Sequence, residues 1–323
     1  MLFRVIPRER KTRALKVGTF GCLRGAYTLN VTQGCGLLCT YCYARGYATA
    51  PAKGDVELFV NLPQLLRREL DSKRRRRLPG MVIFNTATDC FQPHPDILEV
   101  THQAMAILLE GGIGISFLTK GFIPQGFVEL FRGHRERVLA QIGLVSLAEG
   151  YWRTYEPGAA SPAGKLENIE RLLAAGINTE VRIDPIIPFV TDTREELEVL
   201  FQALSRKGIR RVSVSYLHLR PAIQKQLSAE LPALHRKLLE GCFESRDWTE
   251  VGMSTRTKLL PKRLRENGYS RVKAIAQAHG ISATICRCKN PDMDGELCAP
   301  SRGRRTIPRT LIPRGKQLTL FPC

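Results

Sequence analysis

The sequence has no long apolar run. Residues 1–8 lack the continuous apolar stretch of a secretory signal, and no later segment is long enough to span a bilayer. Internal repeats are also lacking, which excludes solenoid and propeller architectures. We therefore expect a cytoplasmic protein with no membrane partner.

Acidic residues are scarce. The 323 residues include 49 Lys and Arg but only 30 Asp and Glu, which gives a net charge of +19. Segments 1–24, 256–273 and 299–323 carry most of this excess. A single such segment is typical of a solvated surface, but three on one chain favour binding to a polyanion, and nucleic acid is the first candidate. The hydrophobic content of 43% excludes a disordered chain.

Short β-branched runs alternate with helical patterns from residue 27 onward. We predict strands at residues 27–32, 81–85, 114–119, 138–146, 179–183 and 211–217. We predict helices at residues 97–110, 162–175 and 193–207. This alternation indicates parallel strands with crossover helices, and six strands predict an α/β fold of the partial (βα)6 TIM-barrel type rather than a closed barrel of eight.

Local signals support two of these helices. Ser161 stands before a proline, Thr193 has capping-box spacing to Glu196, and Gly176 and Gly208 are placed to end the helices. We expect three regions along the chain. They are a basic N-terminal segment at 1–24, the barrel core at 25–220, and a helical and basic C-terminal extension at 221–323 that contains a second cysteine cluster.

Ten cysteines in a chain without an export signal are expected in a reducing compartment, where clusters are metal ligands more often than disulfides. Cys35, Cys39 and Cys42 form a CxxxCxxC arrangement directly after the first predicted strand. Three close thiolates favour an iron–sulfur cluster with one iron not bound by protein. The alternative is a zinc knuckle that takes a fourth ligand from elsewhere.

This motif, with Tyr41 before its third cysteine, resembles the radical SAM superfamily over roughly residues 25–220. The resemblance implies that Cys35, Cys39 and Cys42 hold a [4Fe–4S] cluster whose fourth iron chelates S-adenosylmethionine. Reduction, by a donor such as flavodoxin or ferredoxin, would cleave this cofactor to methionine and a 5′-deoxyadenosyl radical.

Further motifs resemble the spore photoproduct lyase-like branch of that superfamily. They are Thr88-Asp89-Cys90, Thr119-Lys120, Tyr155-Glu156-Pro157, Ser161-Pro162 and Asp184-Pro185. The branch is named for an enzyme that repairs ultraviolet-damaged thymines in DNA. The resemblance therefore implies radical chemistry of a lyase or transferase type, with DNA repair or nucleotide modification as the expected outcome.

The resemblance also places the cofactor against side chains at the strand ends. It implies binding positions at Tyr41, Tyr43, Thr86, Thr88, Asp89, Lys120, Ser146 and Arg182. Lys120 would meet the carboxylate of S-adenosylmethionine, Ser146 its ribose, and the two tyrosines the cluster and the adenine side. Arg182 either faces the cofactor or pairs with Asp184.

Cys90 is a candidate catalytic residue. In the lyase the cysteine that donates a hydrogen atom lies three residues before the aspartate, and here that position is Thr86. Cys90 instead follows Asp89 directly. It is either a hydrogen-atom donor or extra ligand, or a small buried hydrophobic residue.

A second cluster consists of Cys286, Cys288 and Cys298. Turn signals between the last two are expected to fold the loop back on itself. We predict a metal site here, either an auxiliary iron–sulfur cluster or zinc, completed by Cys22, Cys323 or His279. Cys242, alone in a helical segment, is expected in the core.

The leading hypothesis is thus a radical SAM enzyme that acts on nucleic acid. One alternative is a non-catalytic nucleic-acid-binding protein with two structural zinc sites. Another keeps the radical chemistry but has a peptide or small metabolite as substrate.

Overall fold

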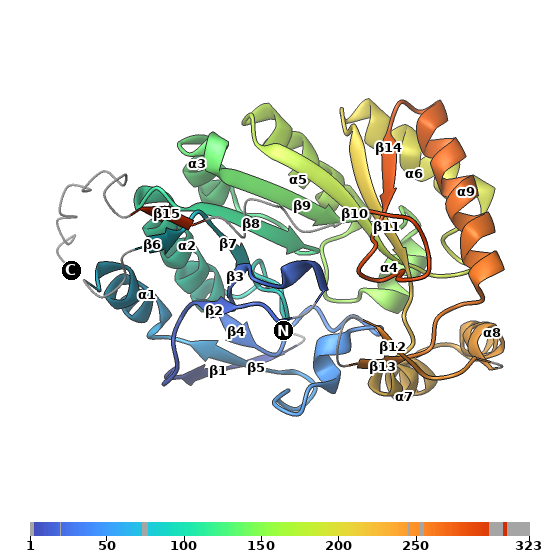
Figure 1. Cartoon of the computed structure of the whole chain (residues 1–323), viewed down its shortest axis with the longest axis horizontal. Coiled ribbons are helices and arrows are strands. Elements are labelled where there is room, and N and C mark those ends of the chain that lie inside the picture. Colours follow the sequence, from blue (N-terminus) through green and yellow to red (C-terminus); the bar gives the residue numbers. More distant parts are fainter. Residues whose placement is uncertain are drawn as a thin grey trace.

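The computed structural model describes residues 3–19, 21–72, 77–244, 246–251, 255–296 and 306–308. Their main feature is an open eight-stranded sheet with the order β14-β11-β10-β9-β8-β7-β3-β2, in which β2 alone runs antiparallel. Its strands are β2 (Lys16–Val17), β3 (Tyr27–Leu29), β7 (Met81–Phe84), β8 (Gly114–Thr119), β9 (Val138–Gly143), β10 (Asn178–Ile186), β11 (Arg211–Tyr216) and β14 (Ser282–Ile285). Figure 1 shows the sheet curled into a partial barrel with helices outside it.

The apolar content of the strands explains why both faces of this sheet are covered. All four residues of β7 are buried, and β8 has five of its six residues buried. Such continuous burial is typical of parallel strands enclosed by crossover helices. The helices are α1 (Leu62–Asp71), α2 (Pro95–Glu110), α3 (Gln125–Arg132), α4 (Glu149–Tyr155), α5 (Pro162–Ala174), α6 (Arg194–Arg206), α7 (Pro221–Glu230), α8 (Ala233–Phe243) and α9 (Lys262–Ala278).

The predicted capping signals are confirmed. Ser161 Oγ accepts a hydrogen bond from the Gly164 backbone at 3.1 Å, and Thr193 Oγ1 accepts one from the Glu196 backbone at 3.3 Å. Gly176 and Gly208 have φ values of +73° and +86°, a conformation that favours glycine after a helix.

The predicted fold class and all six predicted strands are confirmed. One further parallel strand, β14, was not predicted; it pairs with β11 from Arg211↔Ser282 to Val214↔Ile285. Part of the segment after residue 220 therefore continues the main sheet, with α9 packed beside β14. No described helix has the length and apolar character needed to cross a bilayer.

A second, smaller sheet lies beside the barrel near the N-terminus. It contains β1 (Arg4–Arg8), β5 (Asp55–Phe59) and β4 (Thr32–Gln33), in the order β1-β5-β4. Two-stranded sheets are formed by β12 (Thr249–Val251) with β13 (Thr255–Thr257), and by β6 (Arg77–Pro79) with β15 (Thr306–Pro308). Short 3₁₀ turns occur at η1 (Gly21–Leu23), η2 (Tyr43–Gly46) and η3 (Arg135–Arg137).

Candidate functional site

The loop with the first cysteine cluster follows β4 and crosses the carboxyl end of the sheet. Its backbone is anchored by the loop after β7 and by the end of α4, because Gly36 N donates to Gln92 Oε1 at 2.7 Å and Thr40 N donates to the Tyr155 carbonyl at 3.0 Å. Gly36 must be a glycine here, since a Cβ would lie 2.3 Å from the ring of Phe3. The loop is therefore held in one conformation by contacts from the strand ends.

The thiols of Cys35, Cys39 and Cys42 are partly buried and are not arranged for a single metal ion. Among the described residues, these three are not a group whose ligand atoms all lie within 4.8 Å of one another. A tetrahedral zinc ion with Zn–S bonds of about 2.3 Å would hold its sulfurs about 3.8 Å apart. Their wider spacing fits a cluster of several irons better than a zinc knuckle.

Burial raises the pKa of the Cys35 thiol well above its ordinary value, and the charge of Asp89 adds to this effect. Burial, followed by the charge of Glu156, also raises the pKa of Cys39. Both cysteines would therefore be protonated at neutral pH without a metal. A bound metal is what can hold them as thiolates.

Asp89 connects the ends of two neighbouring strands. Its carboxylate accepts hydrogen bonds from Phe91 N at 2.8 Å, Thr119 Oγ1 at 2.7 Å and Lys120 N at 2.8 Å. Burial raises the pKa of this carboxyl despite these donors. Asp89 thus fixes the loop after β7 to the end of β8.

Lys120 extends from the end of β8 across the mouth of the barrel. Its Nζ lies 3.1 Å from the Asp184 carbonyl oxygen and 3.5 Å from Glu156 Oε1. Gly143, the last residue of β9, leaves room for it, since a Cβ there would lie 2.8 Å from both Cγ and Nζ of Lys120. The ammonium also lies 5.9 Å from the centre of the Tyr41 ring.

Glu156 is a buried carboxylate behind the cysteine loop. It accepts hydrogen bonds from Tyr41, from Tyr151 at 3.1 Å and from Lys165, whose side chain is itself only 2% exposed. Burial opposes the charge of Glu156, but Lys120 and Lys165 outweigh it and lower the pKa to about 2. This carboxylate therefore remains charged and orders both Tyr41 and Lys120.

The other predicted cofactor positions have partners within the protein, and their role toward a cofactor remains a prediction. Ser146 Oγ donates to Glu196 at 2.7 Å. Arg182 pairs with Asp184 at 2.8 Å, which is one of the two roles predicted for Arg182. Tyr43 donates its hydroxyl to the carbonyl of Thr86.

Thr88, beside the cysteine loop, has a side-chain hydroxyl without a protein partner in the described part of the chain. Its Oγ1 is buried and has no hydrogen-bond partner among the described residues. Buried hydroxyls are normally paired, so an orphaned one beside the cysteine loop fits a polar group of a bound cofactor.

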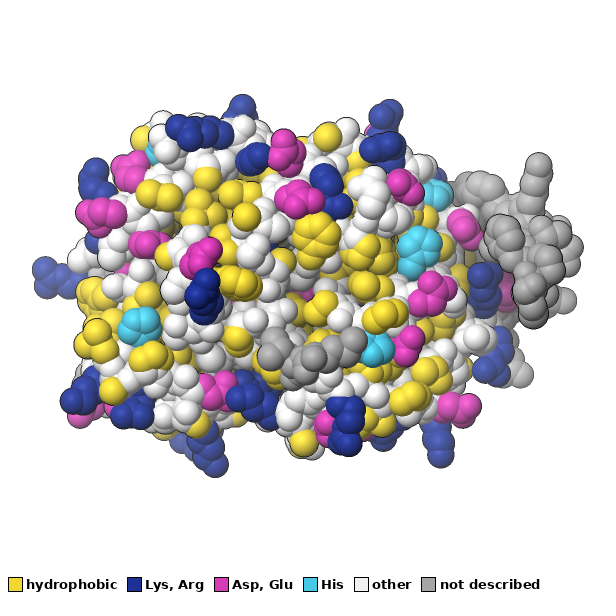
Figure 2. Space-filling view, turned by 180° about the vertical axis from the view of Figure 1, so that it is seen from behind, with side chains coloured by type: hydrophobic (Ala, Val, Ile, Leu, Met, Phe, Trp, Pro, Cys, Tyr) yellow, Lys and Arg dark blue, Asp and Glu magenta, His cyan; other side chains and the backbone are white. Residues whose placement is uncertain are grey.

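A cavity of about 1140 Å³ opens beside Cys35, Cys42 and Thr88. One wall comes from β1, β5 and the segment that follows β1, and another from η2 and α7. The basic side chains that line it are Arg8, Arg10, Lys11, Lys16, Arg45, Lys53 and Lys225, against the acidic Glu9 and Asp55. By contrast, Lys and Arg on the face in Figure 2 are scattered, mostly at its edge, with acidic side chains among them.

Cys90 is fully buried in the hydrophobic core and does not border this cavity. This environment fits the alternative of a small buried hydrophobic residue, and burial raises the pKa of its thiol. Cys242 in α8 is half-buried and packs against the core.

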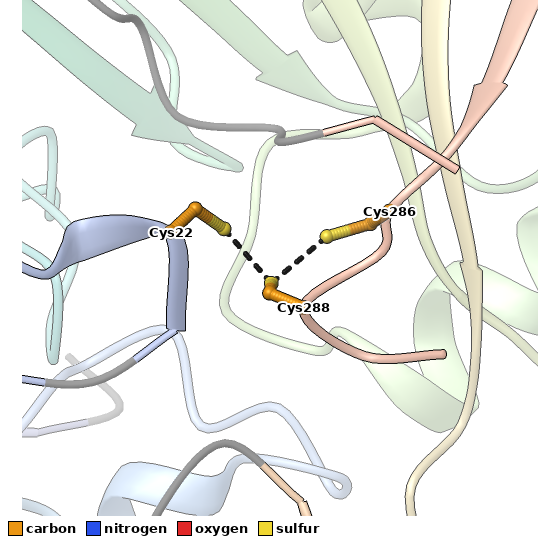
Figure 3. A group of neighbouring side chains, drawn as sticks. All are labelled: Cys22, Cys286 and Cys288. Atoms are coloured by element: carbon orange, nitrogen blue, oxygen red, sulfur yellow. Dashed lines mark hydrogen bonds between the residues drawn. The ribbon is translucent and has the colours of Figure 1, made fainter. Parts of the chain in front are cut away.

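The second cysteine cluster includes a residue from the other end of the chain. Sγ of Cys22 lies 2.8 Å from Sγ of Cys288, and Sγ of Cys286 lies 3.0 Å from the same atom (Figure 3). Cys298 and Cys323 lie outside the described residues, and Cys298 remains a prediction. His279, another candidate fourth ligand, instead pairs with Glu198 at 2.9 Å.

Sequence reasoning missed the role of Glu156 and Lys165. Tyr155-Glu156-Pro157 was noted only as a motif, and no local pattern marks Lys165 as a buried ion-pair partner. The one available signal was a lysine on the buried side of the 162–175 helix pattern, beside Ile169 and Leu172.

The family model described as Radical SAM superfamily matches residues 29–204 of this chain, more than half of its length. The chain belongs to the radical SAM superfamily. It is therefore an enzyme rather than a non-catalytic zinc protein, and membership implies an iron–sulfur cluster and S-adenosylmethionine.

Two relatives illustrate the range of this similarity. An uncharacterized protein of Mycobacterium tuberculosis is 29% identical over 71% of this chain and 69% of its own. A protein named "Radical SAM Nalpha-GlyT isomerase" from Pseudomonas phage M6 is 26% identical over 77% of this chain and 48% of its own.

Among solved structures, spore photoproduct lyase complexed with dinucleoside spore photoproduct has a TM-score of 0.67 at 15% identity, covering 87% of this chain and 82% of the lyase. Another structure of that lyase, with bound AdoMet, has a TM-score of 0.65. At this identity the likeness concerns the fold.

Proposed function

We propose that this radical SAM enzyme holds a [4Fe–4S] cluster on Cys35, Cys39 and Cys42 and acts on nucleic acid. The cluster, when reduced by a donor such as flavodoxin or ferredoxin, supplies the electron that cleaves S-adenosylmethionine. The spacing of the three thiols and the orphaned Thr88 hydroxyl support this assignment.

The chain's own residues would bind and orient the cofactor. The Lys120 ammonium would bind the carboxylate of S-adenosylmethionine, and its ion pair with Glu156 holds the lysine side chain in position. Tyr43, Thr86, Thr88, Asp89, Ser146 and Arg182 are proposed to surround the remaining polar groups. Several of these act through the loops they order, since the Asp89 carboxylate is already occupied by three donors.

The basic cavity beside the cysteine loop is the observation that supports nucleic acid as the substrate. Lys11, Lys16 and Lys225 line it, are exposed, and form no ion pair with any described residue. At about 1140 Å³ it exceeds the roughly 300–1,000 Å³ typical of pockets for one small ligand. Its charge and size favour a phosphate-bearing substrate held next to the cofactor.

One similar solved structure supports the same class. The structurally similar lyase was solved with a dinucleoside spore photoproduct. DNA repair or nucleotide modification, by lyase or transferase chemistry, is accordingly the proposed outcome.

The proposed cluster and its cleavage of S-adenosylmethionine are tested by replacing Cys35, Cys39 and Cys42 together with alanine. We expect protein purified without oxygen to lose about four irons per chain and to stop forming 5′-deoxyadenosine, while remaining folded. Cys242→Ala is the matched control and should change neither quantity. Continued 5′-deoxyadenosine formation in the triple variant would refute the assignment.

The proposed binding of nucleic acid in the basic cavity is tested with a Lys11→Gln/Lys16→Gln/Lys225→Gln variant. If each lysine contacts a phosphate, the slope of log K against log salt should become shallower by about 2 for single-stranded oligonucleotides and by about 2.7 for duplex DNA. An Arg132→Gln/Arg210→Gln/Lys237→Gln variant removes the same charge away from the cavity and should leave the slope unchanged. Equal effects in both variants, or no binding at low salt, would favour a peptide or small metabolite instead.

A further inference from the structure

The second cysteine cluster connects opposite edges of the open sheet. Cys22 lies in η1, within the connection between β2 and β3, and β2 is one edge of the main sheet. Cys286 and Cys288 directly follow β14, which is the other edge. Their sulfurs nevertheless meet, as Figure 3 shows, across a separation of 266 residues along the chain.

The sulfur positions suit a single metal ion. Among the described residues, only these three metal-ligating side chains have ligand atoms that all lie within 4.8 Å of one another. Separations of 2.8 and 3.0 Å are well above a disulfide bond of about 2.05 Å. They are about 1 Å short of the spacing around tetrahedral zinc, so a small side-chain adjustment would admit the ion. The first cluster, with wider spacing, has no such arrangement.

The loop that contains Cys286 and Cys288 is held in place by several hydrogen bonds. Lys289 N donates to the Cys286 carbonyl at 3.1 Å, which closes a turn around Cys288. The buried side chain of Asn290 donates to the same carbonyl at 3.0 Å and accepts from Tyr269 at 3.1 Å and Arg265 at 3.2 Å. These contacts, which come from α9, preorganise the two ligands without any contribution from the ion.

The same loop reaches the mouth of the barrel. Lys289 Nζ lies 2.6 and 2.7 Å from the two carboxylate oxygens of Asp184 at the end of β10. The backbone carbonyl of Asp184 in turn accepts from Lys120. Whatever holds Cys288 in place therefore also restrains Lys289 against the strand end that Lys120 contacts.

We propose that Cys22, Cys286 and Cys288 supply three of the ligands of one zinc ion that clamps the two edges of the partial barrel together. Soft thiolate ligands in a buried, preformed site are the donor set that zinc prefers. In a closed barrel, hydrogen bonds between the first and last strands join the two edges of the sheet. Here the zinc ion would join them instead. It has a structural role and takes no part in radical formation.

The first test is the metal content of the Cys35→Ala/Cys39→Ala/Cys42→Ala variant, which lacks the proposed radical cluster. We expect about one zinc per chain, with sulfur ligands at about 2.3 Å by X-ray absorption at the zinc edge. About four irons per chain in this variant would mean an iron–sulfur cluster at the second site and would overturn the proposal. Because that variant has no radical chemistry, this outcome is independent of the proposed function.

The second test uses Cys22→Ser, with Cys242→Ser as the matched control. Zinc should fall below about a fifth of the wild-type level in the first variant and remain unchanged in the second. Undiminished zinc in Cys22→Ser, or a Cys22–Cys288 disulfide detected by mass spectrometry without reduction, would each refute the assignment.

A third measurement addresses the clamp and needs no variant. Release of zinc from the wild-type protein by a chelator should accelerate amide hydrogen exchange at least tenfold in residues 21–26 and 286–296, but not in α5. Exchange that is unchanged at both edges would show that the ion does not join them.

Discussion

Replacing Glu156 with glutamine should destabilise the protein by about 3 kcal/mol at pH 7. The carboxylate is fully buried and its pKa is lowered from 4.5 to about 2 by Lys120 and Lys165. A shift of that size corresponds to about 3 kcal/mol, since each pKa unit is worth about 1.4 kcal/mol. Loss of one partner of a buried ion pair leads to a similar value of roughly 3–5 kcal/mol, because Lys165 would keep a buried charge without a counter-ion.

The sign of the pH dependence follows from the lowered pKa. Glu156 contributes its full stabilisation above about pH 4.5, and the contribution is lost as the pH falls toward 2. The difference in unfolding free energy between wild type and Glu156→Gln should therefore shrink by about 2 kcal/mol between pH 7 and pH 3.

Urea unfolding of both proteins after removal of metals measures this difference at each pH. Glu149→Gln in α4 is the matched control, because its partner Arg153 is 72% exposed and such surface pairs contribute at most about 1 kcal/mol. A destabilisation below 1 kcal/mol at pH 7 for Glu156→Gln, or a difference that stays constant with pH, would refute the assigned network.

Two further predictions concern the barrel mouth. Gly143→Ala should displace Lys120 and raise the Kd for S-adenosylmethionine roughly tenfold by calorimetric titration, the cost of one charge-assisted contact. Gly126→Ala, where a Cβ meets nothing within 4 Å, is its control, and an unchanged Kd for Gly143→Ala would contradict the assigned path of Lys120. Asp89→Asn should lower the free energy of unfolding by about 2 kcal/mol, because the amide cannot accept from both Thr119 and the Lys120 backbone as the carboxylate does. Stability equal to wild type in a urea titration would argue against this role.

The barrel strands and the first cysteine cluster could be predicted because their signals are local. Each of the six strands is an apolar run with turn signals around it, and Cys35, Cys39 and Cys42 lie within eight residues. The strand β14 was missed because its sequence, Ser-Ala-Thr-Ile, is short and stands among basic and polar residues. Only pairing with β11 makes it part of the sheet.

The supporting contacts could not be predicted because their partners lie on separate elements that only the folded chain brings together. Glu156 collects its donors from positions 41, 120, 151 and 165, on four separate elements. Cys22 was one of three candidates for the second cluster, and no spacing rule favours it over Cys323. Packing of the sheet edges is what brings it to Cys288.

The small β1-β5-β4 sheet has a consequence for how substrate choice can change. All three of its strands contribute to the cavity wall, whereas Lys120, Ser146 and Arg182 belong to the barrel strands or to the loops that follow them. Substitutions in β1 and β5 can therefore reshape the outer wall without touching the cofactor positions. A library confined to the lining positions Pro7, Arg8, Asp55 and Phe59 would vary this wall while the residues Lys120, Ser146 and Arg182 stay the same.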